Sequence, residues 1–316
     1  MRRTLPKTAH PAPRCASSFR RCGALWRPIY LVRGLVRGLV RGLACGLAVF
    51  WCLLGGLLGG CAGPAAFSPE PSHGFFARQV VTRQGTHKFW IYRPTHHTAD
   101  RKWPVILYLH GGGERGQDGL AQTQVGLGPA VQATLGYFPF IVVFPQCTPQ
   151  GFWAMPDMAQ RAMEALEIAL RDFNGDPERV YVTGNSMGGY GTYYLAARYP
   201  GRFAALAPIC GGVRPPPWIR VPKAEQLIDL ADPYASMARK LGRTPVWIFH
   251  GAQDFFVPVE QSRQMARALR ESGGIVRYTE WPGVGHAAEQ PTYAEPALFE
   301  WLLQQRRGQP SPDAGR

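Results

Sequence analysis

The first sixty residues contain no aspartate and no glutamate. They hold 10 of the 35 Lys and Arg residues, mostly in a basic run over residues 2–27, followed by an apolar, glycine-rich stretch over residues 43–60. A positively charged segment that precedes an apolar one with small residues at its end is the pattern of a secretory signal. Positive charge stays on the cytoplasmic side while the apolar part enters the membrane. Residues 1–60 are therefore predicted to be a signal segment.

The end of this segment carries a second pattern. Leu58-Gly59-Gly60-Cys61 resembles the lipobox of bacterial lipoprotein signals. That resemblance implies acylation of the Cys61 thiol, a membrane anchor through the attached lipid, and an exported lipoprotein of the periplasm or cell envelope. An uncleaved single-span anchor is an alternative, because 18 apolar residues just suffice to cross a bilayer. Simple cleavage is another. Five glycines make the stretch a poor permanent helix, which favours the lipoprotein.

Beyond residue 60 the excess of positive charge is small. The remaining 25 Lys and Arg face 21 Asp and Glu, which leaves a net charge of about +4. That balance is ordinary for a protein surface, so the high charge of the whole chain belongs to the signal segment. It gives no reason to expect a nucleic-acid partner.

Cysteine is scarce outside the signal segment. Of seven cysteines, only Cys147 and Cys210 follow the proposed lipid site. A disulfide framework and metal-ligand spacing are both absent, so no metal site is expected. Each of the two follows a different predicted strand, which favours two separate buried thiols; a disulfide between them in an oxidising compartment is the alternative.

The rest of the chain is predicted to form one domain. Residues 61–77, rich in Pro, Ser, Gly and Ala, are expected to be a tether, residues 78–306 the folded domain, and residues 307–316 a disordered tail. The length of the middle part is ample for a single large core. Residues 211–244, which include Pro215-Pro216-Pro217, are expected to form an insertion near the site.

Strands and helices alternate through this domain. A hairpin is expected over residues 80–92 around Gln84-Gly85, with buried strands at 105–109, 140–144, 180–183, 204–209, 246–249 and 276–280. Helical spacing of apolar residues predicts helices at 158–173, 187–198, 259–271 and 294–304. This order predicts an α/β fold: a mostly parallel central sheet with an antiparallel N-terminal hairpin and helices on both faces. Ligands bind such sheets at the carboxyl ends of the strands.

A nucleophile motif lies between a predicted strand and the next helix. Gly184-Asn185-Ser186-Met187-Gly188 fits G-x-S-x-G, in which the serine occupies a sharp strand-to-helix turn and the glycines let neighbouring backbone approach. The start of the following helix directs a positive dipole at charge that develops during attack. A glycine-rich turn with an N-capping serine is the structural alternative.

A serine hydroxyl needs an adjacent base to act as a nucleophile. In this type of fold the chain order is serine, then Asp or Glu, then histidine. Of the eight histidines only His286 follows the last predicted strand, whereas His110 and His250 close strands and are expected to be structural.

A carboxylate must orient that histidine and stabilise the imidazolium. Asp254 follows the strand 246–249 and is the preferred candidate. Its competitors are two residues of the insertion and one at the start of a helix: Asp229, Asp232 and Glu260.

The glycines of His110-Gly111-Gly112-Gly113 follow another predicted strand. Two backbone N–H donors are needed to stabilise a tetrahedral oxyanion, one from this loop and one from the residue after the nucleophile. Gly112 and Met187 are the predicted donors, with Gly113 as the alternative to Gly112.

Three motifs together resemble a known group. They are the residues 110–116, Phe144-Pro145-Gln146-Cys147 with Trp153 downstream, and the residues 184–189. They look like the predicted-peptidase and phospholipase/carboxylesterase-like branch of the bacterial α/β-hydrolases, a branch similar to dienelactone hydrolases, feruloyl esterases and prolyl oligopeptidase catalytic domains. The resemblance covers residues from about 80 to about 303.

The resemblance implies a cofactor-free serine hydrolase with the triad Ser186, Asp254 and His286. Trp153 is expected to line the acyl or alcohol pocket, with core packing as the alternative, and Glu114 and Arg115 to form an ion pair that holds the oxyanion loop. Cleavage of carboxylic esters through an acyl-serine is the preferred function, on a small ester or an acylated polysaccharide. The alternatives are a serine peptidase of prolyl oligopeptidase type and a non-catalytic binding lipoprotein. The sequence makes no prediction of oligomeric state.

Overall fold

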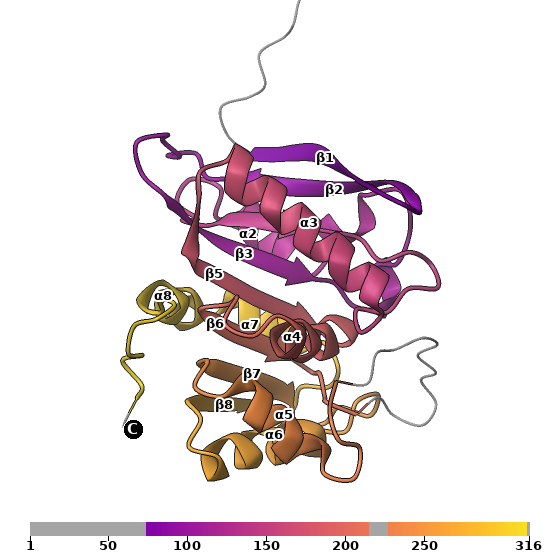
Figure 1. The fold of residues 1–316 in the computed structure, drawn as a ribbon, viewed down its shortest axis with the longest axis vertical. Helices are drawn as coiled ribbons and strands as arrows, with labels where there is room; N and C mark the ends of the chain where they lie inside the picture. The colour runs from indigo at the N-terminus through magenta and orange to yellow at the C-terminus, as the bar shows by residue number, and fades with distance from the viewer. Residues whose placement is uncertain (1–73, 215–226, 315–316) are drawn as a thin grey trace, which may run out of the picture. The chain divides into compact units, whose positions relative to one another are not determined.

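The computed structural model describes residues 74–214 and 227–314 (Figure 1). The signal segment over residues 1–60, Cys61 and most of the expected tether lie outside the described residues and stay predictions. Among the residues that are described, no helix is long and apolar enough to cross a membrane.

Eight strands form one sheet in the order β1-β2-β4-β3-β5-β6-β7-β8. The β1–β2 and β2–β4 pairs are antiparallel, and every other neighbouring pair is parallel. The strands are β1 Gly74–Thr82, β2 Gly85–Arg93, β3 Trp103–Leu109, β4 Ile141–Phe144, β5 Gly175–Asn185, β6 Ala205–Ile209, β7 Val246–Gly251 and β8 Val276–Trp281. The predicted mostly parallel sheet with an antiparallel N-terminal hairpin is confirmed.

Helices cover both faces of the sheet, as predicted (Figure 1). The α-helices are α2 Leu127–Ala133, α3 Pro156–Asp172, α4 Met187–Arg198, α5 Pro233–Leu241, α6 Glu260–Glu271, α7 Glu289–Ala294 and α8 Pro296–Gln304. Short 3₁₀ helices, η1 Gly112–Glu114 and η2 Ala121–Thr123, follow β3. Helices α3 to α6 share one hydrophobic cluster with the sheet, and α2, α7 and α8 share the other.

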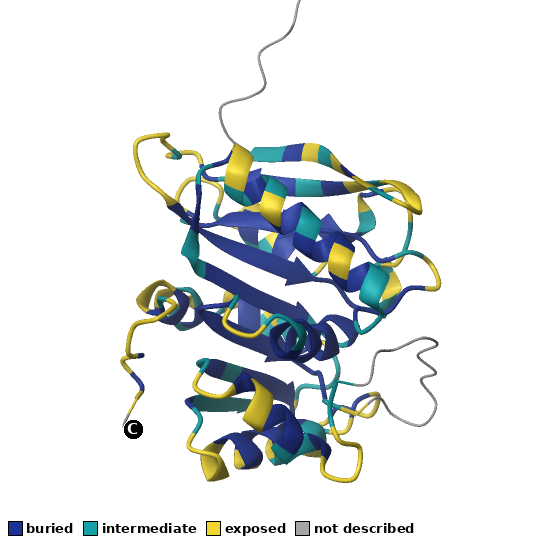
Figure 2. Cartoon of the chain, viewed as in Figure 1, coloured by how far each residue is buried: buried dark blue, intermediate teal, exposed yellow. Residues whose placement is uncertain are grey.

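The central strands are buried on both faces because each face carries its own layer of helices (Figure 2). In β3 every residue is buried. Val105, Leu107 and Leu109 belong to the cluster under α3 and α4, whereas Ile106 and Tyr108 belong to the opposite one. Successive strand residues point to opposite faces, so a strand covered on both sides requires a continuous apolar run.

Several predicted boundaries differ from the structure. Strand β1 begins at Gly74, inside the expected tether, because it pairs with β2 along its whole length up to Arg93. The expected helix 294–304 is α8, which begins two residues later at Pro296, a residue that is tolerated in the first turn of a helix; the preceding short helix α7 was not predicted. The expected insertion 211–244 contains helix α5, which contacts α4 and α6.

The prediction of a disordered tail over residues 307–316 is wrong for its described part. Ser311 and Asp313 are buried. The Asp313 carboxylate accepts hydrogen bonds from the Trp301 indole, at 2.7 Å, and from the guanidinium of Arg277. Polar and small residues near the C-terminus suggested disorder, but buried donors on α8 and β8 need an acceptor that this segment supplies.

The substitution Asp313→Ala is expected to lower the free energy of unfolding by about 1–3 kcal/mol, because the buried indole N–H of Trp301 loses its acceptor. Urea denaturation measures the change. The control is Asp232→Ala, which removes an exposed carboxylate 3.7 Å from Arg239 and should change stability by less than about 0.5 kcal/mol. Equal midpoints for Asp313→Ala and the wild type would contradict a packed C-terminal segment.

Candidate functional site

Ser186 occupies the turn between β5 and α4. Its φ of 54° lies in the left-handed region, which is unfavourable for a residue with a side chain. Two backbone hydrogen bonds hold this conformation: Ser186 N–H donates to the Ile209 carbonyl of β6 at 2.9 Å, and the Ser186 carbonyl accepts from Tyr190 N–H at 3.1 Å. The turn therefore places the Ser186 hydroxyl at the carboxyl end of β5.

The glycines beside Ser186 are required by a close backbone approach. A Cβ on Gly188 would lie 1.8 Å from the Leu109 carbonyl oxygen, and one on Gly184 would lie 2.3 Å from the same atom. Both distances are far below contact range, so a side chain at either position would push α4 away from β3. This is the physical reason for the two glycines of G-x-S-x-G.

The structure brings the three predicted triad side chains together. His286 Nε2 lies 2.8 Å from Ser186 Oγ, and His286 Nδ1 lies 2.7 Å from Asp254 Oδ2. The residues follow β5, β7 and β8, so all three lie at the carboxyl ends of parallel strands. A proton on Nδ1 that is donated to Asp254 leaves Nε2 free to accept from the serine hydroxyl.

Asp254 is the buried acceptor at the centre of a wider network. Its Oδ1 accepts the backbone N–H groups of Phe256 and Val257, each at 2.9 Å. Its Oδ2 lies 3.3 Å from His250 Nε2 in addition to its bond with His286. Burial on its own would raise the pKa of the Asp254 carboxyl, but the hydrogen bonds from His250, His286 and Val257 hold that pKa well below its usual value. The carboxylate is therefore ionised at neutral pH.

His250 is a partner of the Asp254 carboxylate, a role that the sequence pattern did not predict. Its Nδ1 accepts from the Ser262 hydroxyl at 2.6 Å, which leaves the ring proton on Nε2. That proton faces the Val257 carbonyl at 2.9 Å and Asp254 Oδ2. The signal was present as a histidine four residues before the carboxylate, although only the fold shows that the two side chains meet.

The competing carboxylates have other partners. Asp232 pairs with Arg239 and Glu260 with Arg263, both on the surface, and Asp229 accepts from the Ala231 N–H. Among the residues that the structure describes, Asp254 alone of the four candidates bonds to His286.

The predicted oxyanion donors lie on two elements that flank Ser186. Met187 is the first residue of α4, and the first hydrogen bond of that helix is made by Tyr190, so the Met187 N–H precedes the helical pattern. On the loop after β3, the Glu114 carboxylate crowds Gly111, where a Cβ would lie 3.1 Å from Glu114 Oε2. The N–H groups of Gly112 and Gly113 remain as candidates.

The expected ion pair between Glu114 and Arg115 is absent among the contacts of the described residues. Arg115 Nε instead donates to the Gly112 carbonyl at 2.9 Å. Glu114 Oε2 lies 3.9 Å from His110 Nδ1, and burial raises the pKa of the Glu114 carboxyl. The two side chains thus point to different partners, and Arg115 holds the loop through the Gly112 carbonyl and not through an ion pair.

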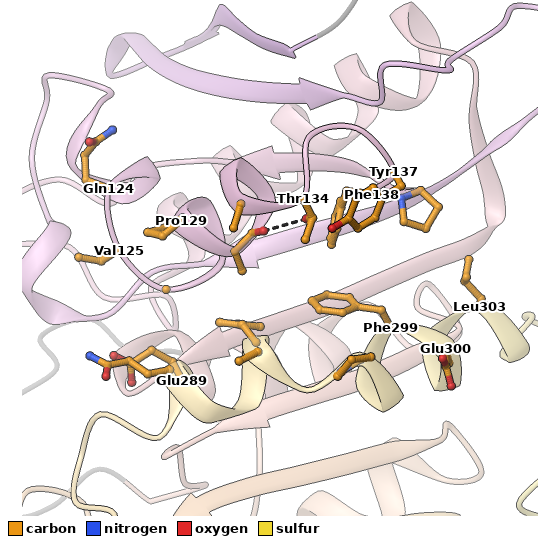
Figure 3. A pocket seen from close by; sticks show the side chains of 18 residues that line it. Gln124, Val125, Pro129, Thr134, Tyr137, Phe138, Glu289, Phe299, Glu300 and Leu303 are labelled. Atoms are coloured by element: carbon orange, nitrogen blue, oxygen red, sulfur yellow. Dashed lines mark hydrogen bonds between the residues drawn. The ribbon is translucent and has the colours of Figure 1, made fainter.

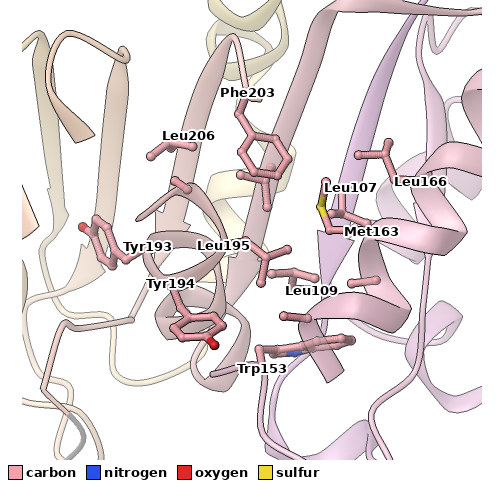
Figure 4. Close-up of a cluster of buried hydrophobic side chains, with 14 of the residues drawn as sticks. Leu107, Leu109, Trp153, Met163, Leu166, Tyr193, Tyr194, Leu195, Phe203 and Leu206 are labelled. Atoms are coloured by element: carbon pink, nitrogen blue, oxygen red, sulfur yellow. The ribbon is translucent and has the colours of Figure 1, made fainter. Parts of the chain in front are cut away.

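The prediction that Trp153 lines a substrate pocket is wrong. Its side chain is fully buried beside Leu109 and Leu195 (Figure 4). The indole N–H donates to the His110 carbonyl at 3.0 Å, and a Cβ on Gly191 would lie 2.5 Å from the Trp153 Cβ. Core packing, the alternative, is what the structure has, because α4 approaches this ring through a glycine.

The two cysteines beyond residue 61 are free and buried, as predicted. Cys210, His250 and Asp254 offer atoms within 4.8 Å of one another, the spacing of a metal site. Both ring nitrogens of His250 already form hydrogen bonds, and burial raises the pKa of the Cys210 thiol to about 12. The cluster therefore fits a hydrogen-bonded support for Asp254 better than a cation site.

An apolar groove of about 830 Å³ runs between α2 and the pair α7–α8 (Figure 3). Phe138 and Phe299 are among its apolar lining residues, and Glu289 lies at one end. Glu289 is close enough to His286 for the two to interact electrostatically, although burial is the larger influence and raises the pKa of its carboxyl. The groove thus begins beside the triad, but the triad residues themselves do not line it.

Comparisons with known proteins support the fold. A family model described as the dienelactone hydrolase family matches residues 145–297. A solved structure described as a thermostable esterase is 31% identical, with a TM-score of 0.61 over 74% of this chain and 63% of that one. The chain belongs to the α/β-hydrolase superfamily. The predicted α/β-hydrolase fold is thereby confirmed.

Other relatives of this α/β-hydrolase are longer proteins. An uncharacterized secreted protein of Arthroderma benhamiae is 30% identical over 58% of this chain but only 21% of the relative. An acylamino-acid-releasing enzyme of Arabidopsis thaliana is 25% identical over 60% of this chain and 28% of the relative. The α/β-hydrolase thus spans less than a third of the length of these two curated relatives.

The substitution Asp254→Asn is expected to lower the free energy of unfolding at pH 7 by about 2–4 kcal/mol, because an amide has a single acceptor oxygen and cannot accept from the two backbone N–H groups on one side and the two imidazoles on the other. A carboxyl whose pKa is depressed in the folded state stabilises the protein above its unfolded pKa, near 4, and this contribution is lost as the pH falls further. The difference in urea midpoint between wild type and variant should therefore be constant down to about pH 4 and shrink below it.

The matched control is Asp172→Asn, an exposed carboxylate beside Arg171. It should leave the midpoint unchanged at every pH. A wild-type to Asp254→Asn difference that stays constant from pH 7 to about pH 3 would contradict the depressed pKa.

Proposed function

We propose that this protein is a serine hydrolase that cleaves carboxylic esters through an acyl-serine intermediate. The observation that carries the proposal is the unbroken chain of hydrogen bonds from Asp254 through His286 to Ser186. Such a chain activates a hydroxyl that is otherwise a poor nucleophile at neutral pH.

In the proposed acylation step, Ser186 Oγ attacks the ester carbonyl carbon while its proton moves to His286 Nε2. The carbonyl oxygen becomes an oxyanion that the N–H groups of Met187 and Gly112 stabilise. As the intermediate collapses, the ester C–O bond breaks and His286 returns the proton to the leaving alcohol. Asp254, held by four donors, keeps the imidazole in place and stabilises its charged form.

Deacylation repeats these steps with water as the nucleophile. His286 takes a proton from the water, and the hydroxide attacks the acyl carbon. Ser186 leaves with the returned proton, and the product is the free acid. The ester and one water are consumed, the alcohol and the acid are released, and Ser186 and His286 return to their starting protonation states.

Esters are proposed over amides as substrates. A relative at 31% identity is described as an esterase, and the matching family model is named for dienelactone hydrolases. The curated acylamino-acid-releasing enzyme supports the second candidate, a peptidase that uses the same triad. Assays of p-nitrophenyl esters and N-acylated amino-acid amides side by side distinguish the two.

Export is part of the proposal. The signal pattern over residues 1–60 and a relative named as secreted both support export, and the lipobox-like residues 58–61 are the reason to propose the periplasm or cell envelope. Cys61 is proposed as the lipidated residue, and small esters or acylated polysaccharides of that compartment as substrates. The mass of the N-terminal peptide of the mature protein distinguishes an acylated Cys61 from simple cleavage and from an uncleaved anchor.

The substitution Ser186→Ala is expected to lower kcat/KM for p-nitrophenyl butyrate by about 10³-fold or more, because the nucleophile is lost. Labelling by a fluorophosphonate probe should disappear with it, since only an activated serine reacts. Ser272→Ala, at the end of α6, is the control and should retain both activities. An unlabelled wild-type protein would favour the non-catalytic binding protein instead.

The substitution Gly112→Pro tests the oxyanion donor. Proline is well tolerated at the first position of a helix, and Gly111 before it has the extended conformation that proline requires, with φ −73° and ψ −174°. The loop should therefore be preserved while one N–H is removed, so we expect kcat to fall about 10²–10³-fold with little change in KM. Gly113→Ala, whose Cβ would meet open space, should stay close to wild type. Full activity in Gly112→Pro would move the donor role to Gly113.

A further inference from the structure

A second pocket, of about 410 Å³, lies apart from the triad. It is formed by the β1–β2 hairpin, the residues that follow the oxyanion loop and helix α3. Its lining is polar and includes Gln79, His87, Lys88, Gln117, Gln146 and Arg161. The charged side chains of the lining are Lys88 and Arg161, both positive, and the nearby carboxylate of Asp118 is already bonded to the Gln146 amide at 2.9 Å.

Arg161 is the unusual member of this lining. It is only 4% exposed. Across residues 74–214 and 227–314, its guanidinium has no ion pair within 4.0 Å and no hydrogen-bond partner, and its Nε is fully buried. Burial of a charge without a partner is costly, so buried arginines are normally paired. Burial also lowers the pKa of the Arg161 guanidinium.

The acidic groups nearest to Arg161 do not supply the missing partner. Asp157 and Glu164 lie on the same helix and interact with it electrostatically. Neither forms an ion pair with it, and Glu164 instead accepts from Gln160 at 2.8 Å. Arg161 thus lines the pocket with no carboxylate of the described residues within ion-pair distance of its guanidinium.

A second cation reinforces this arrangement. Lys88 of β2 lines the same pocket, and so does His87, whose pKa is lowered by burial and by the charge of Arg161. The amides of Gln79 and Gln117 are further polar groups of the lining that can donate hydrogen bonds to an anion.

We propose that this pocket binds an oxyanion, a carboxylate or phosphate group, with Arg161 as its main ligand and Lys88 as the second cation. A guanidinium presents two parallel N–H donors that match the two oxygens of such a group. The anion would neutralise the buried charge and satisfy its donors.

The pocket lies on the same rim of the sheet as Ser186. The hairpin turn is on the side to which the arrowheads of β3 and β5 point (Figure 1). Gln146 follows the carboxyl end of β4, and its Nε2 donates to the Glu114 carbonyl of the oxyanion loop at 3.0 Å. The anion is therefore either an acidic group carried by the ester substrate or a small separate anion. The first case rests on the proposed function, whereas binding itself does not.

The test uses Arg161→Met, which keeps the length of the side chain and removes its charge. For the wild type, phosphate and malonate are each expected to raise Tm, and calorimetry should give a dissociation constant that the variant weakens about tenfold to a hundredfold. Without an anion, Arg161→Met should be as stable as the wild type or more so, since an unpaired buried charge is removed. Arg171→Met, an exposed arginine of the same helix, should bind like the wild type.

Two results would overturn the proposal: no response of the wild type to either anion, or an equal response of wild type and Arg161→Met. The source of the anion follows from activity. If Arg161→Met loses kcat/KM only for hemiesters such as p-nitrophenyl succinate, the anion is a group of the substrate. If the ratio of kcat/KM for p-nitrophenyl succinate to that for p-nitrophenyl butyrate is the same in Arg161→Met and the wild type, the anion is a separate ligand. Wild-type binding with no esterase activity at all would refute the proposed function and leave the anion site standing.

Discussion

The site depends on one close contact, the passage of the start of α4 against the end of β3. The backbone there leaves no room for a Cβ at Gly184 or Gly188, and it forces Ser186 into the left-handed region at a cost of about 1–2 kcal/mol. A hydrogen bond to β6 and the buried core around α4 offset that cost. This conformation places the Ser186 hydroxyl beyond the end of β5, next to the unpaired N–H groups at the start of α4.

A second constraint is the full hydrogen bonding of a buried charge. Asp254 accepts from two backbone N–H groups and two imidazoles, so its carboxylate stays ionised away from water. Because its partners come from a turn, a buried histidine and the loop after β8, they fix the carboxylate from several directions. His286 is thereby oriented by a group that cannot rotate or take up a proton at neutral pH.

Arg161 shows the opposite case within the same fold. Both side chains are buried charges at the same rim of the sheet, but one is fully bonded by the protein and the other is not. A satisfied charge stabilises its surroundings, whereas an unsatisfied one stores unfavourable energy that a ligand of opposite sign can release. This contrast separates a residue that holds the site together from one that awaits a binding partner.

Local patterns in the sequence determined the order of strands and helices, the elbow at Ser186 and the candidates His286 and Asp254, because strand-to-helix turns and continuous apolar runs leave a signature in neighbouring residues. Other features depend on residues far apart in the chain. Trp153 is a core residue because α4 offers a glycine opposite it, Asp313 is ordered by an indole on α8 and a guanidinium on β8, and His250 meets Asp254 only once β7 is in place. Burial and pairing are properties of the packed chain, so only the tertiary structure could decide which polar side chains are satisfied by the protein and which line a pocket without a partner from it.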